Sequence, residues 1–117
     1  MGNPSPLRYP GGKYKISKLI ALLLSKAGDN CSTYIEPFAG GAGIAIDLLL
    51  RDVVAQIVIN DSDPAIASFW KAVVQETDAF IDKIDSTPVT IEEWRNQREI
   101  YLTAKKYSLD YGFDSYA

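Results

Sequence analysis

The amino-acid sequence predicts a mixed α/β domain built on a parallel sheet. Two short runs rich in β-branched and apolar residues, 32–36 (STYIE) and 55–60 (AQIVIN), have the composition of buried strands. Each run is followed by a turn and then by a segment whose apolar residues recur at helical spacing. Because a helix is the usual connection between parallel strands, this alternation predicts a doubly wound sheet with helices on both faces.

The first half of the chain adds a lead-in and two helical segments to these strands. Residues 1–12 contain three prolines and three glycines and are expected to be extended and irregular. From residue 13 to about 27, apolar side chains stand at i, i+3, i+4 and i+7, which indicates an amphipathic helix. This apolar stripe consists of Ile16, Leu19, Ile20 and Leu23. Residues 43–51 (GIAIDLLLR) form the second helical segment, directly after a glycine-rich turn.

Three more helices are predicted after residue 60. Asp63 and Pro64 have the residue types of an N-cap and a first helical position, before a helix that extends through residue 73. Residues 77–84 are expected to form a short helix. Thr90 and Glu93 have the spacing of a capping box before a last helix. That helix contains Trp94, Arg98, Tyr101 and Leu102.

Composition excludes several kinds of site. The 117 residues, 47% of them apolar, make one domain's worth of chain. Histidine is absent and Cys31 is the single cysteine, so a Ser-His-Asp triad, a cysteine-histidine zinc site and an internal disulfide are excluded. The apolar runs are too short to cross a bilayer and no secretory leader is recognisable. We therefore expect a cytoplasmic protein without membrane contact.

Charge is distributed unevenly along the chain. Residues 1–28 carry five basic and no acidic residues, whereas the remainder carries seven basic and fifteen acidic ones, for a net charge of −3. An acidic chain is a poor general nucleic-acid binder, so contacts with phosphate or DNA are expected from the basic N-terminal arm. A solvated basic helix is the alternative interpretation of this arm.

The segment EPFAGGAG, residues 36–43, indicates where a ligand would bind. In an open parallel sheet, ligands bind beyond the carboxyl ends of the strands, and this segment follows the first predicted strand. Its glycines permit a tight turn and the close approach of a ligand to the backbone. A dinucleotide fingerprint would need a third glycine after Gly41-Ala42-Gly43, where Ile46 stands instead, so the spacing argues against NAD.

Asp61 ends the second predicted strand, eighteen residues after Gly43. A carboxylate in this position can accept hydrogen bonds from both hydroxyls of a ribose. Together with the glycine-rich turn it favours an adenosine ligand without a pyrophosphate. The alternative is that Asp61 only caps the next helix and that the glycines form an ordinary turn.

Three motifs resemble those of a known family. LRYPGGK (7–13), YIEPFAGGAG (34–43) and IVINDSDPAIASFWKAV (57–73) are similar, in order, to the first three motifs of the Dam-like DNA adenine-N6 methyltransferases. The resemblance covers roughly residues 5–75. It implies S-adenosylmethionine as cofactor and a Rossmann-like class I methyltransferase sheet in residues 1–75. Residues 76–117 would be the helical start of a target-recognition region, with WRNQREIY (94–101) similar to its opening.

The resemblance also implies the cofactor-binding residues. EPFAGG would wrap the methionine end of S-adenosylmethionine, with Phe38 and Gly40 along it, while Asp61 would hold the ribose. Tyr9 and Lys13 would lie near the methionine carboxylate.

Glu36 has two interpretations, as a ligand of the cofactor's amino group or as a supporting residue behind the site. We favour the first, because a buried carboxylate without a partner is costly.

The sequence lacks the catalytic motif of this family. The family uses Asp-Pro-Pro-Tyr to hold the target adenine, whereas Asp63-Pro64 is followed by Ala65, and Asn3-Pro4-Ser5-Pro6 lacks the aromatic residue. Both segments are therefore expected to be structural, and no catalytic residue is assigned. We expect the chain to be the cofactor-binding N-terminal part of a methyltransferase, with weak or no binding of double-stranded DNA. Its uncovered sheet edge would favour self-association.

Two other functions remain open from the sequence. The chain could be a non-catalytic S-adenosylmethionine-binding module or subunit that needs a partner chain. More distantly, it could be a plain nucleotide-binding domain. Neither the recognised DNA sequence nor membership of a restriction-modification system can be read from these residues.

Overall fold

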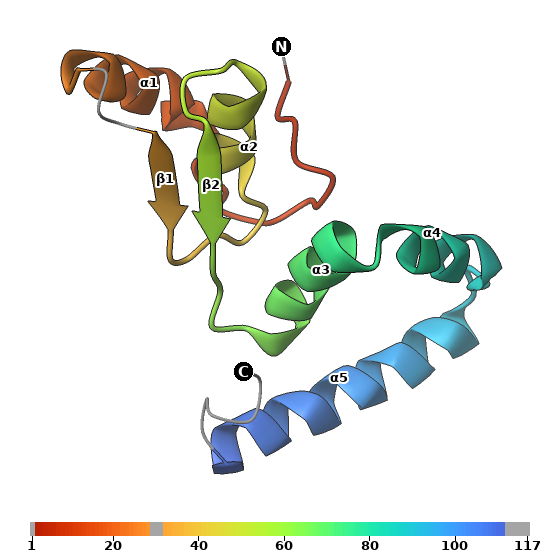
Figure 1. Ribbon diagram of the computed structural model, residues 1–117. Coiled ribbons are helices and arrows are strands. Elements are labelled where there is room, and N and C mark those ends of the chain that lie inside the picture. The colour runs from red at the N-terminus through yellow and green to blue at the C-terminus, as the bar shows by residue number, and fades with distance from the viewer. Residues whose placement is uncertain (1, 29–31, 112–117) are drawn as a thin grey trace. The chain divides into compact units, whose positions relative to one another are not determined.

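A computed structural model of the protein describes residues 2–28 and 32–111 (Figure 1). The chain begins with a short 3-10 turn, helices and strands then alternate through the second strand, and three helices follow. The elements are η1 (Lys13–Ile16), α1 (Ser17–Lys26), β1 (Thr33–Glu36), α2 (Gly43–Leu50), β2 (Gln56–Ile59), α3 (Pro64–Gln75), α4 (Thr77–Ser86) and α5 (Ile91–Tyr111). Each predicted strand and helix is present, with ends that differ by a few residues.

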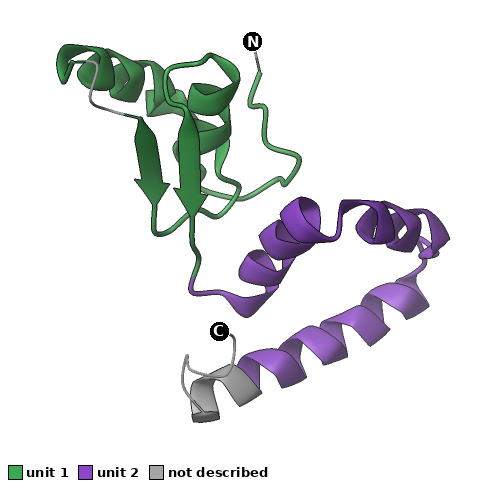
Figure 2. Cartoon of the chain, viewed as in Figure 1, with its two compact units in different colours: residues 1–61 green, residues 62–117 purple. Residues whose placement is uncertain are grey.

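The chain forms two compact units, residues 1–61 and 62–117 (Figure 2). The first contains the sheet with α1 and α2, and the second contains α3, α4 and α5. The boundary expected between residues 75 and 76 separates a cofactor-binding part from a target-recognition region, and not two compact units. It stays a prediction. Residues 112–117 of the predicted target-recognition region lie outside the described residues.

The sheet of the first unit consists of β1 and β2, paired in parallel. Thr33 pairs with Gln56 at one end and Glu36 with Ile59 at the other, so the two carboxyl ends are level. Both arrows point the same way in Figure 1, and α2 connects them. The parallel pairing predicted from the sequence is confirmed over these residues.

The core of this unit lies between α2 and one face of the sheet. Ile44, Leu48 and Val54 are buried at its centre. The partly buried side chains around them come from α1, β1, the turn before β2, and β2: Ile20, Ala21, Leu24, Tyr34, Val53 and Ile57. Because side chains alternate along a strand, Tyr34 and Glu36 share this covered face.

The opposite face of the sheet carries exposed side chains. Ile35 and Val58 are register partners there, and Ile35 is 64% exposed. In the first unit, α1 and α2 thus cover one face. Helices on both faces, as in a Rossmann-like sheet, stay a prediction.

The apolar stripe predicted for α1 is shifted by one residue. Leu19 and Leu23 are more than half exposed, whereas Ile20, Ala21 and Leu24 pack against the core. The shift has a polar cause, because Ser17 at the start of α1 is itself buried.

The Ser17 hydroxyl donates a hydrogen bond to Asp47 of α2, and the Arg51 guanidinium pairs with the same carboxylate. Arg51 Nη2 also donates to Ser17 Oγ over 3.3 Å. Since a buried hydroxyl needs a partner, this contact fixes which side of α1 faces α2.

Side-chain hydrogen bonds and aromatic contacts hold the second unit together. Asp63 is the N-cap of α3, and its Oδ1 accepts a hydrogen bond from the Ala65 amide over 2.8 Å, as the sequence predicted. Asp63 Oδ2 accepts a second bond from the Tyr101 hydroxyl over 3.1 Å, which ties α5 to the start of α3. Phe69 contacts Trp70 and Phe80 edge to face.

The predicted capping box is present in part, since Thr90 Oγ1 accepts a hydrogen bond from the Glu93 amide. Among the described residues, no helix combines the length and the apolar character needed to cross a membrane.

The contact between α1 and α2 can be tested by replacing two serines of the same helix. We expect Ser17→Ala to lower the free energy of unfolding by about 1 to 3 kcal/mol, because the buried Asp47 carboxylate loses a donor. Ser25→Ala is the matched control, since Ser25 is exposed, and its effect should stay within about 0.5 kcal/mol. Urea unfolding followed by circular dichroism measures both, and equal midpoints would contradict a role for the cluster.

Candidate functional site

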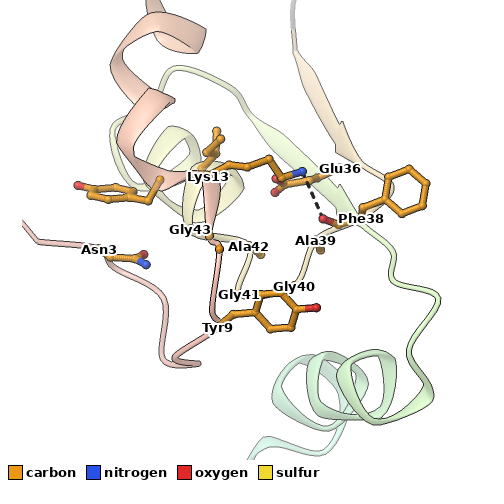
Figure 3. A pocket seen from close by; sticks show the side chains of 14 residues that line it. Asn3, Tyr9, Lys13, Glu36, Phe38, Ala39, Gly40, Gly41, Ala42 and Gly43 are labelled. Carbon is orange, nitrogen blue, oxygen red and sulfur yellow. Dashed lines mark hydrogen bonds and ion pairs between the residues drawn. The ribbon is translucent and has the colours of Figure 1, made fainter. Parts of the chain in front are cut away.

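The candidate site is a hollow at the carboxyl end of β1, which we call the glycine-loop hollow (Figure 3). It lies within the first unit, between the glycine-rich turn and the N-terminal segment that precedes α1. Five of the six predicted cofactor residues line it: Tyr9, Lys13, Glu36, Phe38 and Gly40. Its enclosed volume of about 50 Å³ is far below the roughly 300 Å³ of a complete small-molecule pocket, so it can enclose one end of a ligand only.

Glu36 is the buried acid of this hollow. It is the last residue of β1 and is 4% exposed. Its Oε1 atom lies 3.8 Å from Lys13 Nζ, whereas Oε2 is buried without a hydrogen-bond partner among the described residues. A buried carboxylate oxygen without a donor is unfavourable, so its presence here calls for a ligand or a functional reason.

Burial raises the pKa of Glu36 above its ordinary value of 4.5. Two contacts oppose the effect of burial without cancelling it, namely the positive charge of Lys13 and the nearby Ala45 amide. Burial, followed by the negative charge of Glu36, also raises the pKa of Tyr34 on the same strand. The site therefore holds a carboxyl group that a further positive charge would favour in its ionised form.

Lys13 brings the positive charge to the same place. It is the first residue of η1, and its Nζ donates a hydrogen bond to the Phe38 carbonyl over 3.4 Å. Figure 3 shows the lysine side chain extended toward Glu36 and the Phe38 carbonyl. About half of this side chain is exposed, so the ammonium group can also reach a ligand.

The glycines of the turn are covered by the chain itself, which differs from the sequence interpretation. Gly40 has a φ of 49°, and a Cβ atom there would lie 2.8 Å from Cδ1 of the Tyr9 ring. At Gly43 a Cβ atom would lie 2.6 Å from Asn3 Oδ1. The space that these glycines leave is therefore filled by the N-terminal segment, and a ligand would meet the edge of that segment.

Asn3 is a lining residue that the sequence analysis did not assign to the site. It lies beside Gly43 at the start of α2, and its Oδ1 accepts a hydrogen bond from the Ser5 amide over 3.0 Å. Forty residues separate Asn3 from Gly43 in the sequence, and no periodicity or spacing links them. Tyr14 of η1 lines the hollow as well and was missed for the same reason.

The Phe38 ring does not face the hollow. It is 69% exposed, and Figure 3 shows it directed away from Tyr9 and the glycines. The residue lines the hollow, but its ring could contact a ligand only outside the enclosed part.

Asp61 supports the glycine-rich turn from the end of the second strand. It does not line the hollow, but its Oδ2 accepts a hydrogen bond from the Gly40 amide over 2.8 Å. The N-cap of α3 is Asp63, so the alternative in which Asp61 caps that helix does not describe the structure. The glycine-rich turn and Asp61, which the sequence analysis singled out, are thus in direct contact.

Backbone hydrogen bonds extend the pairing of the strands beyond their ends. The Asn60 amide donates to the Glu36 carbonyl over 3.0 Å, and the Ala39 amide donates to the Asn60 carbonyl over 2.9 Å. The Asn60 side chain donates to the Pro37 carbonyl over 3.2 Å. These contacts hold the turn rigidly against β2. Within the described ranges, no group of three or more acidic, cysteine or histidine side chains is placed to hold a metal ion.

This geometry, a parallel β-α-β unit with an acid and a lysine at its carboxyl edge, defines a mixed α/β protein, and sequence comparison identifies its family. Residues 9–114 match the sequence profile of the D12 class of N6 adenine-specific DNA methyltransferases. The chain belongs to this family. The match includes every predicted cofactor residue and reaches the end of the described chain.

Two curated relatives agree with the family match. The modification methylase StsI of Streptococcus sanguinis is 26% identical over 106 residues, which cover 88% of this chain and 15% of the relative. The type II methyltransferase M.MjaIII of Methanocaldococcus jannaschii is 30% identical over 82 residues, which cover 68% of this chain and 28% of the relative. The chain therefore spans less than a third of the length of either protein. No solved structure matches it.

The packing of Tyr9 on Gly40 can be measured by a double-mutant cycle. Gly40→Ala should lower the free energy of unfolding by about 1 to 2 kcal/mol, because alanine is strained at a positive φ. The overlap between the new Cβ atom and the Tyr9 ring should lower it by about 1 to 3 kcal/mol more. Gly11→Ala is the matched control, because Gly11 also has a positive φ but open space around its Cα. In a Tyr9→Ala background, Gly40→Ala and Gly11→Ala should lower the free energy of unfolding by the same amount. A difference between them that persists in urea unfolding would refute the contact.

The buried carboxyl of Glu36 should make stability depend on pH. Because its pKa is raised in the folded state, the folded chain binds more protons than the unfolded chain between the ordinary value of 4.5 and the raised one. The free energy of unfolding should therefore fall as the pH rises through this window. In Glu36→Gln this fall should be absent, and parallel pH profiles for the two proteins would contradict the assignment.

Proposed function

We propose that this chain is the cofactor-binding part of an S-adenosylmethionine-dependent DNA adenine-N6 methyltransferase. The observation that carries the proposal is the buried Oε2 of Glu36, which lacks a hydrogen-bond donor and lies beside the Lys13 ammonium group. Membership of the D12 class supports adenine in DNA as the substrate. The names of the two relatives, both methylases, support the same reaction.

The hollow suits the amino-acid end of S-adenosylmethionine. That end carries a carboxylate and an ammonium group on one carbon atom, and the site offers one lysine and one carboxyl group 3.8 Å apart. A bound ammonium group would give Glu36 Oε2 the donor that it lacks, while Lys13 would turn toward the ligand carboxylate. The small enclosed volume fits this end of the ligand and leaves the nucleoside outside.

The nucleoside would lie along the outer side of the glycine-rich turn. Asp61 is held against Gly40 there, and a carboxylate can accept further hydrogen bonds besides the one from the amide, including those of ribose hydroxyls. The exposed Phe38 ring offers an apolar surface outside the hollow. Tyr9 would contribute the wall opposite Glu36 and keep the turn in place.

The reaction needs more than these residues provide. S-adenosylmethionine would supply an activated methyl group, and the chain's own contribution would be to bind it, fix its orientation and exclude water from its amino-acid end. The motif that holds the target adenine in the family does not occur in the 117 residues. We therefore propose that this chain by itself transfers no methyl group, that residues 1–75 form the cofactor part of a Rossmann-like domain, and that residues 76–117 begin a target-recognition region.

A non-catalytic module is the second candidate, and two observations favour it. The proposed cofactor residues line a hollow, yet the tetrapeptide does not occur in these 117 residues. Such a module would bind S-adenosylmethionine and act only with a second chain that carries the motif. Either protein would work in the cytoplasm, where DNA and this cofactor are found together.

Calorimetry with two related ligands tests the cofactor site. S-adenosylhomocysteine has the amino-acid end and methylthioadenosine lacks it. Lys13→Met should weaken the first about tenfold or more by removing a charge-assisted hydrogen bond, and should leave the second unchanged. Lys15→Met is the matched control, because Lys15 lies in the same turn but does not line the hollow.

Asp61→Ala should weaken both ligands, because both contain the ribose. A loss of about 1 to 3 kcal/mol is expected when the ribose hydroxyls lose their acceptor. Unchanged affinity for methylthioadenosine would remove Asp61 from the ribose site, and equal losses in Lys13→Met and Lys15→Met would remove Lys13 from the amino-acid site.

Transfer of labelled methyl groups tests the activity of the isolated chain. We expect no incorporation into DNA from the 117 residues alone and recovery of activity when a chain carrying the Asp-Pro-Pro-Tyr motif is added. Incorporation without such a partner would overturn the proposal that the chain is inactive by itself.

A further inference from the structure

Helices α1 and α2 border a second hollow in the first unit, which we call the α1–α2 hollow. Its volume of about 190 Å³ is larger than that of the glycine-loop hollow, and the two helices are in contact (Figure 1). None of the proposed cofactor-binding residues is among the described residues that line it, so it is a separate site, although Tyr14 lines both hollows. Its lining consists of Tyr14, Ser17, Lys18, Asp47 and Arg51.

Two of these lining side chains are polar and buried. Ser17 is 3% exposed and Asp47 is 8% exposed, and the serine hydroxyl donates a hydrogen bond to the carboxylate. Arg51 follows Asp47 by four residues, and its Nη2 atom pairs with the same carboxylate. Because these three side chains hold one another in place, the polar wall of the hollow is formed before any ligand arrives.

The two cations of the hollow have donors to spare. Every side-chain contact of Arg51 is made by Nη2, so its Nη1 and Nε atoms have no partner in the described part of the chain. This side chain is 37% exposed. Lys18, in the first turn of α1, is exposed and has neither a hydrogen bond nor an ion pair with the described residues. Guanidinium and ammonium groups with free donors are suited to bind a phosphate group.

The charges around the hollow also favour an anion. Its lining contains two cations and one carboxylate, and Arg51 neutralises that carboxylate. The charge of Lys18 is therefore left without a counter-ion among the described residues. A phosphate monoester carries close to two negative charges at pH 7 and three acceptor oxygens, so it can bridge both cations. A carboxylate ligand has a single negative charge and two oxygens, and it matches the pair less well.

We propose that the α1–α2 hollow binds a small molecule with a terminal phosphate group, held between Lys18 of α1 and Arg51 of α2. The volume lies below the roughly 300 Å³ of a complete small-molecule pocket, which suits a phosphate group with a short organic part. A hollow lined by buried polar groups favours such a ligand over the backbone of a DNA duplex, whose phosphates lie on a convex surface. The inference goes beyond the proposed function, because S-adenosylmethionine contains no phosphate.

A phosphate in this position would connect two helices that already meet through Ser17 and Asp47. A ligand that binds only the folded chain stabilises it by mass action. With ribose 5-phosphate at about ten times its dissociation constant, we expect the midpoint of thermal unfolding to rise by about 5 °C. Ribose, which has the sugar without the phosphate, should cause no rise.

Nuclear magnetic resonance of the full 117-residue chain, labelled with ¹⁵N, locates the bound ligand. Ribose 5-phosphate should shift the amide signals of Ser17, Lys18 and Arg51, and should leave those of the glycine-rich turn in place. Inorganic phosphate should shift the same signals, and the tighter of the two ligands shows whether a sugar belongs to the natural ligand. Equal shifts with ribose and with ribose 5-phosphate would overturn the proposal.

Calorimetry on charge variants tests the two cations. Lys18→Met should weaken ribose 5-phosphate about fivefold or more, because it removes a charge-assisted hydrogen bond. Lys26→Met is the matched control, since Lys26 is another exposed lysine of α1 but does not line the hollow, and the affinity should stay unchanged. Arg51→Gln should weaken binding as well. Arg51 also supports the contact of α1 with α2, so circular dichroism checks that this variant folds, and Lys18→Met tests the site without that contact.

Three further results would overturn the inference. Equal affinities of Lys18→Met and Lys26→Met would remove Lys18 from the site. Loss of ribose 5-phosphate binding in Lys13→Met would place the ligand in the glycine-loop hollow instead. Displacement of ribose 5-phosphate by a short DNA duplex that itself depends on Lys18 would make the hollow a contact for the DNA backbone.

The same variants keep this site apart from the proposed cofactor site. Lys18→Met should leave the affinity for S-adenosylhomocysteine unchanged, and Lys13→Met should leave that for ribose 5-phosphate unchanged. If the cofactor proposal fails, S-adenosylhomocysteine binds no variant, while the effect of Lys18→Met on ribose 5-phosphate persists. If the phosphate site fails, that effect disappears and cofactor binding is retained.

Discussion

The candidate site depends on the parallel pairing of two four-residue strands. Because β1 and β2 run in the same direction with their carboxyl ends level, the residues that follow them meet at one edge of the sheet. The glycine-rich turn and Asp61 are twenty-one residues apart in sequence and are joined there by one hydrogen bond, from the Gly40 amide to the carboxylate. An antiparallel pairing would have sent these two segments to opposite ends of the sheet, and no common site could have formed.

A second constraint is the polar contact between α1 and α2. The buried Ser17 hydroxyl, held by Asp47 and Arg51, fixes the rotation of α1. Since Lys13 begins the turn directly before α1, the same contact determines where its ammonium group lies. The lysine then reaches Glu36, whose carboxyl is buried at an energetic cost that the described residues do not fully offset. Such a cost at one position is typical of a site shaped for a ligand.

The sequence was informative wherever a local rule applied. The strands at 33–36 and 56–59 follow from their β-branched and apolar composition, and the start of α3 follows from Asp63 and Pro64. Each of these signals lies within a few residues of the structure that it predicts. The stripe of α1 was displaced by one residue, because periodicity counts apolar side chains only and the buried side of the helix includes a serine. The packing of Asn3 over Gly43 had no local signal, since Asn3 comes from a distant segment, whereas Tyr9 was placed at the site by the family resemblance.

By itself, the sequence determined the order of strands and helices, the residues that lie at the strand ends and the family to which the chain belongs. These depend on composition, spacing and motif, which are properties of neighbouring residues. Only the tertiary structure decided that Glu36 is buried with one oxygen lacking a donor, that Asp61 holds the glycine-rich turn, and that the N-terminal segment covers the turn. The physical reason is that burial and hydrogen bonding at this site join segments up to forty residues apart, and such contacts exist only once the chain has folded.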